Sequence, residues 1–153
     1  MTAVILIGIQ GSGKTTFYLQ RFFDTHIRIS LDMLRTRHRE RVLLAACIAA
    51  RQPFVIDNTN VLASERAVYI SAARDAGFRV AGYYFPTPLR IAIARNAKRT
   101  DKKAIPVAGV ASKYKRLQPP TLDEGFDELH TVESAEGGGF VVTEVETTAS
   151  EPA

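Results

Sequence analysis

Residues 3–15 read AVILIGIQGSGKT, an apolar run that passes directly into a glycine-rich turn. The run 3–9 has the length and the apolar character of a buried strand. The turn, residues 8–15, fits the pattern G-x-x-x-x-G-K-[ST] between a strand and a helix, the setting in which this pattern binds phosphate. We therefore predict an α/β domain built around a phosphate-binding loop (P-loop).

The residues of this loop point to a nucleoside triphosphate. Gly11 and Gly13 let the backbone wrap around phosphate oxygens, and the N-terminus of the next helix directs amides and a positive dipole at the anion. Lys14 would reach the β- and γ-phosphates, and the Thr15 hydroxyl would ligate Mg²⁺. We predict ATP or another nucleoside triphosphate, with Mg²⁺, as cofactors; the alternative is a turn that binds no nucleotide. The predicted nucleotide-binding residues of the loop are Gly11, Ser12, Gly13, Lys14, Thr15 and Thr16.

Strand-like and helix-like segments alternate along the rest of the chain. The predicted strands are 3–9, 26–30, 53–57, 78–85 and 129–133. The predicted helices are 14–23, 33–51, 62–76, 88–99 and 107–117. This alternation indicates a P-loop NTPase fold with a mainly parallel sheet of four to five strands flanked by helices. Because ligands bind at the carboxyl ends of strands in such sheets, residues that follow strands are the candidates for the site.

Charge is divided unevenly along the 153 residues. Residues 1–120 hold all 20 Lys and Arg but only 7 of the 16 acids, an excess of 13 positive charges. This favours a basic surface for an anionic partner; the alternative is a domain that is merely rich in arginine. We predict a P-loop domain over 1–133 and an acidic, disordered tail over 134–153. No apolar run approaches the ~20 residues of a membrane span, so we expect no membrane partner. Cys47 is the only cysteine, so no internal disulfide is possible, and we expect a cytoplasmic setting.

Asp57 ends the third predicted strand, as the Mg²⁺-side acid of P-loop proteins does. We predict that Asp57 holds the metal through water or orients Thr15. We also assign Asn58 and Asn60, the next polar residues, to the substrate site. In the alternative interpretation these residues only form a polar turn, with Asn60 as a helix cap.

Residues 30–41, SLDMLRTRHRER, place one acid ahead of arginines at every second position. Phosphoryl transfer needs a carboxylate that takes the proton of the attacking hydroxyl. Asp32 follows the second strand and is our candidate for this general base. Arg35, three residues on, would share a helical face with Asp32 and bind a phosphate of the acceptor. The alternative is that Asp32 only caps a helix.

Arg95 and Arg99 are four residues apart on a predicted helix and so share one face. Arginines at this spacing can fold over the β- and γ-phosphates as a lid and stabilise charge in the transition state. We predict this role for both residues, with a catalytic part for Arg99. The alternative is a solvated basic helix end.

Several of these segments together resemble the kinase domain of the polynucleotide 5′-kinases, from the first strand to about residue 133. The segments are GIQGSGKTT, S-L-D-x-x-R at 30–35, DNTN at 57–60, RNAKR at 95–99, and IPV followed by YKRLQPPTLDEGF within 105–126. The resemblance implies transfer of the ATP γ-phosphate to the 5′-hydroxyl end of DNA or RNA.

The resemblance also implies roles for individual residues. It makes Lys14 and Thr15 the ATP·Mg²⁺ residues and Asp32 the general base. Arg35 would bind the phosphate next to the terminal hydroxyl, and Arg99 would be the main lid arginine, supported by Arg95. The family often has Asn-Arg where this chain has Ser30 and Leu31.

The expected partners follow from the same resemblance. They are 5′-hydroxyl nucleic-acid ends and a separate ligase or phosphatase. No D-x-D-x-T motif occurs in the sequence, so we expect no 3′-phosphatase activity from this chain.

Two other classes of function compete with this hypothesis. A small-molecule P-loop kinase for a sugar, nucleoside or antibiotic shares the P-loop, an acid after the second strand and lid arginines, but it does not need so basic a body. A non-catalytic nucleotide-binding switch needs no pair like Asp32 and Arg35.

Overall fold

Six strands form one sheet in the order β2-β3-β1-β4-β5-β6. The computed structural model describes residues 1–99 and 105–146. Strands β1 to β5 run parallel, and β6 is antiparallel to β5. The predicted α/β fold with a mainly parallel sheet is confirmed, with one strand more than the four to five predicted.

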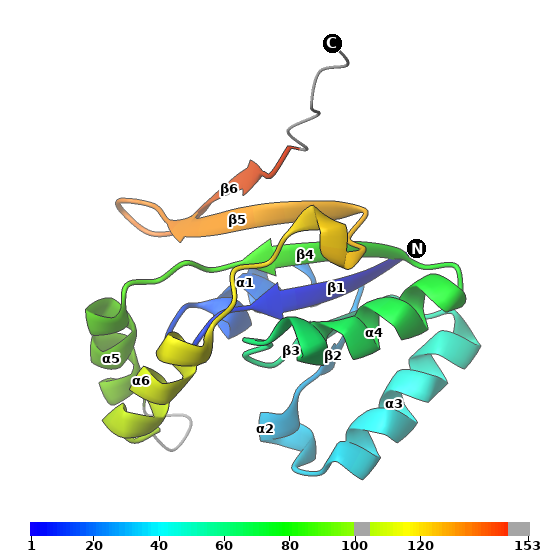
Figure 1. Ribbon diagram of the computed structural model, residues 1–153, viewed down its shortest axis with the longest axis horizontal. Coiled ribbons are helices and arrows are strands. Elements are labelled where there is room, and N and C mark those ends of the chain that lie inside the picture. Colours follow the sequence, from blue (N-terminus) through cyan, green and yellow to red (C-terminus); the bar gives the residue numbers. More distant parts are fainter. Residues whose placement is uncertain (100–104, 147–153) are drawn as a thin grey trace.

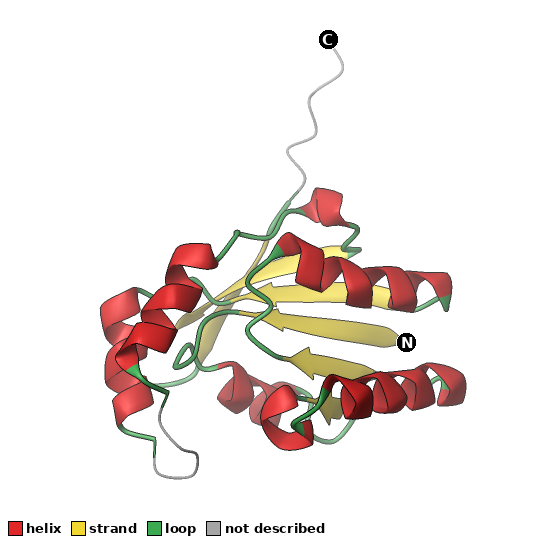
Figure 2. Cartoon of the chain, turned by 60° about the horizontal axis from the view of Figure 1, so that its bottom comes forward, coloured by secondary structure: helices red, strands yellow, loops and turns green. Residues whose placement is uncertain are grey.

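Helices flank this sheet and alternate with the first four strands (Figures 1 and 2). The strands are β1 (Thr2–Ile7), β2 (Ile27–Ile29), β3 (Phe54–Asp57), β4 (Arg79–Tyr84), β5 (Glu128–Ser134) and β6 (Phe140–Glu144). The helices are α1 (Lys14–Arg21), α2 (Leu31–Leu34), α3 (Arg37–Ala50), α4 (Ala63–Asp75), α5 (Leu89–Ala97), α6 (Val107–Arg116) and the 3-10 turn η1 (Leu122–Glu124). Within the described ranges, no helix is long and apolar enough to cross a membrane.

The central strand β1 supplies the core on both faces of the sheet. Successive side chains of a strand point to opposite faces, and every residue from Ala3 to Ile7 is at most 1% exposed. Ala3, Ile5 and Ile7 pack with residues of α3 and α4. Val4 and Leu6 pack with residues of α1 on the other face. The P-loop therefore leaves the sheet from a strand that is buried on both faces.

Helices α5 and α6 lie beyond the carboxyl ends of the strands (Figure 1). A separate apolar cluster of Ile9, Val61, Ala92 and Val110 joins them to the loops that follow β1 and β3. This cluster holds the arginine-bearing helix α5 against the edge of the sheet where ligands of parallel α/β domains bind.

The prediction of one continuous helix over 33–51 is wrong. Helix α2 ends at Leu34, and Arg35 follows with a left-handed backbone, φ 72°. Thr36 is extended, and its hydroxyl accepts a 3.1 Å hydrogen bond from the Arg39 amide, which starts α3. Asp32 and Arg35 therefore do not share the face of a regular helix, as the three-residue spacing had suggested.

The prediction of a disordered tail is wrong for its first part. Strand β6 pairs with β5 along the register from Ser134↔Phe140 to His130↔Glu144. The signal missed was Phe140-Val141-Val142, a β-prone run whose aromatic ring packs at right angles against Phe17 of α1. Residues 147–153 lie outside the described ranges, and the domain boundary at 133 stays a prediction.

Candidate active site

The P-loop closes around the ammonium group of Lys14. Lys14 Nζ donates to the carbonyl oxygens of Gly8 at 2.8 Å and Ile9 at 3.1 Å, and lies 3.4 Å from Ser12 Oγ. Gly13, φ 95°, directly precedes α1, so the first amides of that helix face the loop. This is the strand–turn–helix cradle that binds phosphate, as the sequence predicted.

Helix α5 lies directly on the P-loop. Gly11 has φ 81°, and a Cβ atom there would be 2.3 Å from the Ala92 carbonyl oxygen. Only glycine permits this approach, because both the backbone conformation and the space exclude a side chain. The contact fixes the position of the predicted lid helix relative to the phosphate cradle.

Thr15 and Asp57 meet at the carboxyl ends of β1 and β3. The Thr15 hydroxyl donates to Asp57 Oδ2 at 3.0 Å. Hydroxyl and carboxylate oxygens are the hard ligands that Mg²⁺ prefers. No group of three or more acidic, His or Cys side chains suited to a metal occurs among the described residues. The pair therefore fits a magnesium ion that takes its other ligands from phosphates and water.

A third residue, Arg28 of β2, also binds Asp57. Arg28 Nε donates to Asp57 Oδ2 at 2.7 Å, and its Nη2 lies 3.5 Å from Thr15 Oγ1. The Asp57 side chain is only 2% exposed, so this ion pair neutralises a buried carboxylate. The sequence analysis missed Arg28, which lies in a short strand without a motif.

These groups open onto one large cleft of about 1010 Å³. Its walls include the predicted donor residues Gly11 to Thr16, the predicted acceptor residues Asp32 and Arg35, and both lid arginines. The residues named for the site from the sequence thus come together around one cavity. Seven cationic side chains line it against three acidic ones, all within the described ranges: Lys14, Arg28, Arg35, Arg37, Arg95, Arg99 and Lys113 against Asp32, Asp57 and Glu65.

Asp32 lies in the first turn of α2 and is exposed to the cleft. The N-cap of α2 is Ser30, so the alternative interpretation of Asp32 as the helix cap is wrong. Arg35 directly follows the same short helix as its C-cap. Its positive φ is unusual for a residue with a side chain, and such backbone conformations concentrate at functional sites.

A buried network, which the sequence analysis also missed, supports this acceptor side. Glu40 of α3 is 4% exposed and accepts hydrogen bonds from Tyr69 OH at 2.8 Å, Asn58 Nδ2 at 2.9 Å and Arg37 Nη1 at 3.0 Å. Asn58 Oδ1 in turn accepts from the Leu31 amide at 2.9 Å, one residue before Asp32. Glu40 is the one acid between the arginines of residues 35–41, and this position is the sequence feature that pointed to the network.

The amides of Asn58 and Asn60 are turned toward the protein. Asn60, with φ 50°, donates to the Leu6 carbonyl at 2.7 Å and is 3% exposed. It does not cap α4, whose N-cap is Leu62. Both asparagines line the cleft, and their contact with a substrate stays a prediction.

The two arginines predicted to form a lid lie at the C-terminal end of α5. Arg95 lies in its last turn, but Arg99 follows the helix, which ends at Ala97, so the two do not share a face of this helix as predicted. Arg95 Nη2 donates to Ser134 Oγ at 3.0 Å, so the lid helix is linked to the end of β5. Residues 100–104 lie outside the described ranges.

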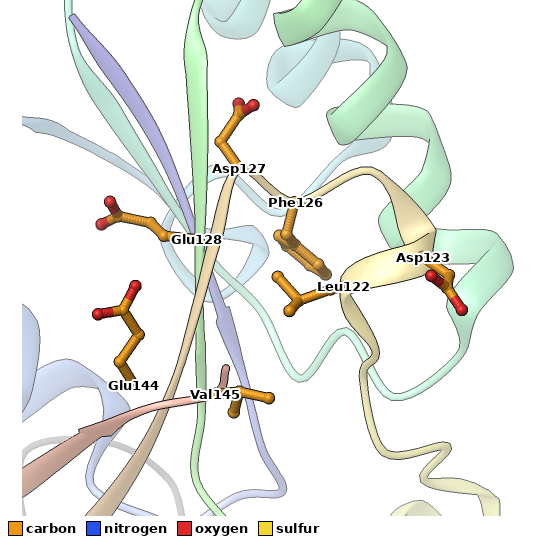
Figure 3. Close-up of a pocket in the computed structure, with 7 residues that line it drawn as sticks. All are labelled: Leu122, Asp123, Phe126, Asp127, Glu128, Glu144 and Val145. Atoms are coloured by element: carbon orange, nitrogen blue, oxygen red, sulfur yellow. The ribbon is translucent and has the colours of Figure 1, made fainter. Parts of the chain in front are cut away.

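A second pocket of about 310 Å³ is lined by residues around η1, β5 and the end of β6 (Figure 3). Glu128 and Glu144 project to one side of β5, and Leu122 and Phe126 lie on the other (Figure 3). Glu128 is bound to Arg79 at 3.1 Å and His130 at 3.2 Å. None of the predicted site residues lines this pocket, so the large cleft is the candidate active site.

A family described as an AAA domain matches residues 4–120. The chain belongs to this AAA domain family. Among curated proteins, this chain is 26% identical over 133 residues to a bifunctional polynucleotide phosphatase/kinase of Schizosaccharomyces pombe. That match covers 84% of this chain and only 33% of the relative, so the chain spans about a third of the relative's length.

Solved structures with the same fold include a gluconokinase and Kti12. A gluconokinase of Sinorhizobium meliloti has a TM-score of 0.62 at 17% identity, over 86% of this chain and 82% of that one. Kti12 of Chaetomium thermophilum, solved with ADP-AlF3, has a TM-score of 0.61 at 18% identity, over 86% of this chain and 88% of that one. The family match and the geometry of the cradle together indicate a nucleotide-binding P-loop domain.

Proposed function

We propose that the protein is a polynucleotide 5′-kinase, which transfers the γ-phosphate of ATP to the 5′-hydroxyl end of DNA or RNA. The observation that carries the proposal is that Asp32 and Arg35 line the same cleft as Lys14 and Thr15. The excess of cationic side chains in that cleft and the distant polynucleotide phosphatase/kinase relative also support it.

In the proposed reaction, Asp32 accepts the proton of the 5′-hydroxyl while the hydroxyl oxygen bonds to the γ-phosphorus. The bond from the γ-phosphorus to its bridging oxygen breaks, and ADP leaves with the electron pair. Lys14 and Arg99 neutralise the charge of the transferred group, and Arg95 supports Arg99. Mg²⁺, held by Thr15 and by Asp57 directly or through water, would neutralise the β- and γ-phosphates.

The acceptor is held by its own phosphates. We assign Arg35 to the phosphate next to the terminal hydroxyl. Arg37, with a side chain 55% exposed, offers a further contact while Glu40 fixes its position. Burial alone would lower the pKa of Arg37, but its hydrogen bond to Glu40 raises it, which keeps the guanidinium charged. Contacts of this kind predict broad sequence tolerance and strong salt dependence.

The second candidate is a small-molecule kinase, which the likeness of fold to the gluconokinase favours. A sugar acid carries a single carboxylate, however, and offers one anionic group to Arg35, whereas Arg28 and Arg37 are already paired with Asp57 and Glu40. A nucleic-acid strand supplies a phosphate for each of several arginines.

One experiment separates these candidates. Labelled γ-phosphate from ATP with Mg²⁺ is offered to matched 5′-hydroxyl DNA and RNA, to a 5′-phosphorylated control, and to gluconate and nucleosides. Label on the hydroxyl ends alone supports the proposal, and label on a small acceptor alone overturns it. Asp32→Asn should bind ATP normally and lose about 100-fold or more of the transfer rate. Normal transfer by this variant would remove Asp32 from the reaction.

A further inference from the structure

Two large apolar side chains are exposed inside the basic cleft. Leu19 of α1 is 56% exposed and Met33 of α2 is 55% exposed, and both line the cavity. Among the described residues, the other exposed large apolar side chains lie outside the cleft. An apolar group kept open to water within a charged cavity is suited to a ligand that is partly apolar.

Both residues lie beside groups of the reaction site. Leu19 is four residues after Thr15 on α1, so the two share one face of that helix. Met33 directly follows Asp32 within α2. A ligand that brings its hydroxyl to Asp32 therefore occupies the cleft whose walls include this apolar pair.

The charges around the pair restrict what that ligand is. Arg28 and Arg35 line the same cavity, and cations outnumber acids along its walls. The ligand therefore combines a flat or apolar part with several negative charges. A sugar acid is polar on every face and would leave Leu19 and Met33 uncovered. A strand of nucleic acid has both parts, because each base presents an apolar face and each linkage carries a negative charge.

From this arrangement we infer that Leu19 and Met33 form the binding site for the terminal base of the acceptor strand. The inference rests on the proposed function and makes it more specific, because it assigns recognition to the base as well as to the phosphates. Contact with the face of a base does not distinguish one base from another. The site therefore favours a terminal nucleotide that has a base over one that has none, whatever the sequence.

The test compares two oligonucleotides that differ only in their 5′-terminal nucleotide, one normal and one abasic, both with a 5′-hydroxyl. The enzymes are the wild type, the double variant Leu19→Ala/Met33→Ala and the control Val42→Ala. Val42 is 56% exposed and lies on α3 outside the cleft. For the normal oligonucleotide, we expect the KM of the double variant to rise about tenfold through loss of apolar contact, with the KM for ATP unchanged.

The abasic oligonucleotide supplies the deciding comparison. With wild-type enzyme, the KM for the abasic oligonucleotide should be about tenfold higher than the KM for the normal one. In the double variant the KM for the abasic oligonucleotide should rise by less than about a further twofold, because the contact with the base is already missing. Two single variants at the same position complete the test. Met33→Ala should raise the KM for the normal oligonucleotide, and Met33→Phe, which keeps a large apolar side chain there, should leave this KM close to that of the wild type.

The remaining outcomes are distinguishable. Transfer to both oligonucleotides with equal KM, or an equal loss on both in the double variant, overturns the base site alone. A wild-type enzyme that phosphorylates neither oligonucleotide overturns the proposed function and the base site with it. The thermal midpoint of each variant, compared with that of Val42→Ala, shows whether a change in KM reflects damage to the fold.

Discussion

The phenol of Tyr69 donates a 2.8 Å hydrogen bond to Glu40 Oε1, although the two residues are 29 positions apart on different helices. Burial, and then the hydrogen bond to Glu40, raise the pKa of Tyr69 to about 12, so the phenol keeps its proton. The carboxylate thus receives neutral and charged donors together. Glu40 thereby joins α3 to α4, and through Asn58 it is linked to the amide of Leu31, the residue before Asp32.

Replacement of Glu40 by Gln keeps the shape of this network and removes its charge. An amide has only one acceptor oxygen, so at least one of the donors Asn58 and Arg37 loses its partner. We expect the free energy of unfolding to fall by about 1–3 kcal/mol, measured by urea denaturation. Tyr69→Phe, which removes one neutral donor, should cost about 1 kcal/mol. A Glu40→Gln protein as stable as the wild type would show that the network is not stabilising.

The ion pair between Arg28 and Asp57 gives a second prediction. Arg28→Met keeps the unbranched side chain as far as the position of Nε but leaves a carboxylate that is 2% exposed without its cation. In the absence of metal we expect a loss of about 2–3 kcal/mol. With Mg²⁺ and ATP, the difference in stability between the variant and the wild type should become smaller, because the metal supplies positive charge to Asp57.

Thermal denaturation with Mg²⁺·ATP and with ATP plus EDTA measures this difference. The exposed Arg41, on α3, is the matched control, and Arg41→Met should behave like the wild type in both conditions. If the thermal midpoints of Arg28→Met and the wild type differ by the same amount with and without Mg²⁺, Asp57 does not take part in binding the metal.

The sequence predicted the phosphate cradle, which is the part of the site that the backbone shapes. The spacing of Gly8, Gly13, Lys14 and Thr15 after an apolar strand is sufficient to define the cradle, because the strand, turn and helix impose its geometry. Parallel topology then placed Asp57 beside Thr15, because Asp57 ends β3 and Thr15 follows the neighbouring strand β1.

Side-chain networks between distant segments were not predictable in the same way. Glu40 lies in a run of arginines, where an acid is usually a solvated partner, and its burial depends on Tyr69 from another helix. The break at Arg35 was missed because a left-handed arginine has no sequence signal of its own. Strand β6 was missed because composition outweighed the short apolar run at Phe140.

Gly11 offers a test of the contact between the P-loop and α5. Gly11→Ala places a Cβ atom 2.3 Å from the Ala92 carbonyl, so α5 must move. Gly137 has a similar φ, 79°, but nothing lies within 4 Å of its Cβ position. Gly137→Ala should therefore cost only the backbone strain, about 1–2 kcal/mol.

We expect Gly11→Ala to cost more than this and to weaken nucleotide binding by about tenfold or more, because the lid arginines move with α5. Urea denaturation and ATP titration measure the two effects. Equal stability and equal ATP affinity of the two variants would show that the close approach of α5 is unimportant.

Strand β6 contributes to the core through Phe140. Its ring lies 5.3 Å from the ring of Phe17 at 83° and 6.3 Å from that of Phe85 at 90°. Phe140→Ala should lower the free energy of unfolding by about 2 kcal/mol, less than for a fully buried ring because Phe140 is half-buried. Val141, its neighbour, is 54% exposed, and Val141→Ala should change stability by less than about 0.5 kcal/mol. Similar small effects of both variants would mean that β6 is not part of the folded core.

His26 makes the stability of the fold depend on pH. Its ring nitrogens lie 2.7 Å from the hydroxyl oxygens of Thr2 and Thr25, and its ring packs edge-on against Phe22. Burial, and then the positive amino terminus, lower the pKa of His26 below its usual 6.5. The unfolded chain therefore takes up a proton at a higher pH than the native protein does.

It follows that the stability contributed by neutral His26 is fully present above pH 6.5 and is lost as the pH falls from there toward the lowered native pKa. The thermal midpoints of the wild type and of His26→Asn, compared at about pH 7.5 and about pH 5.5, measure this dependence. The wild type should lose more stability on acidification than the variant, in which the titrating ring is absent. His38→Gln, at an exposed position, should follow the wild type. His26→Asn has no ring to protonate. If this variant loses as much stability as the wild type between the two pH values, the acid sensitivity of the fold comes from other groups.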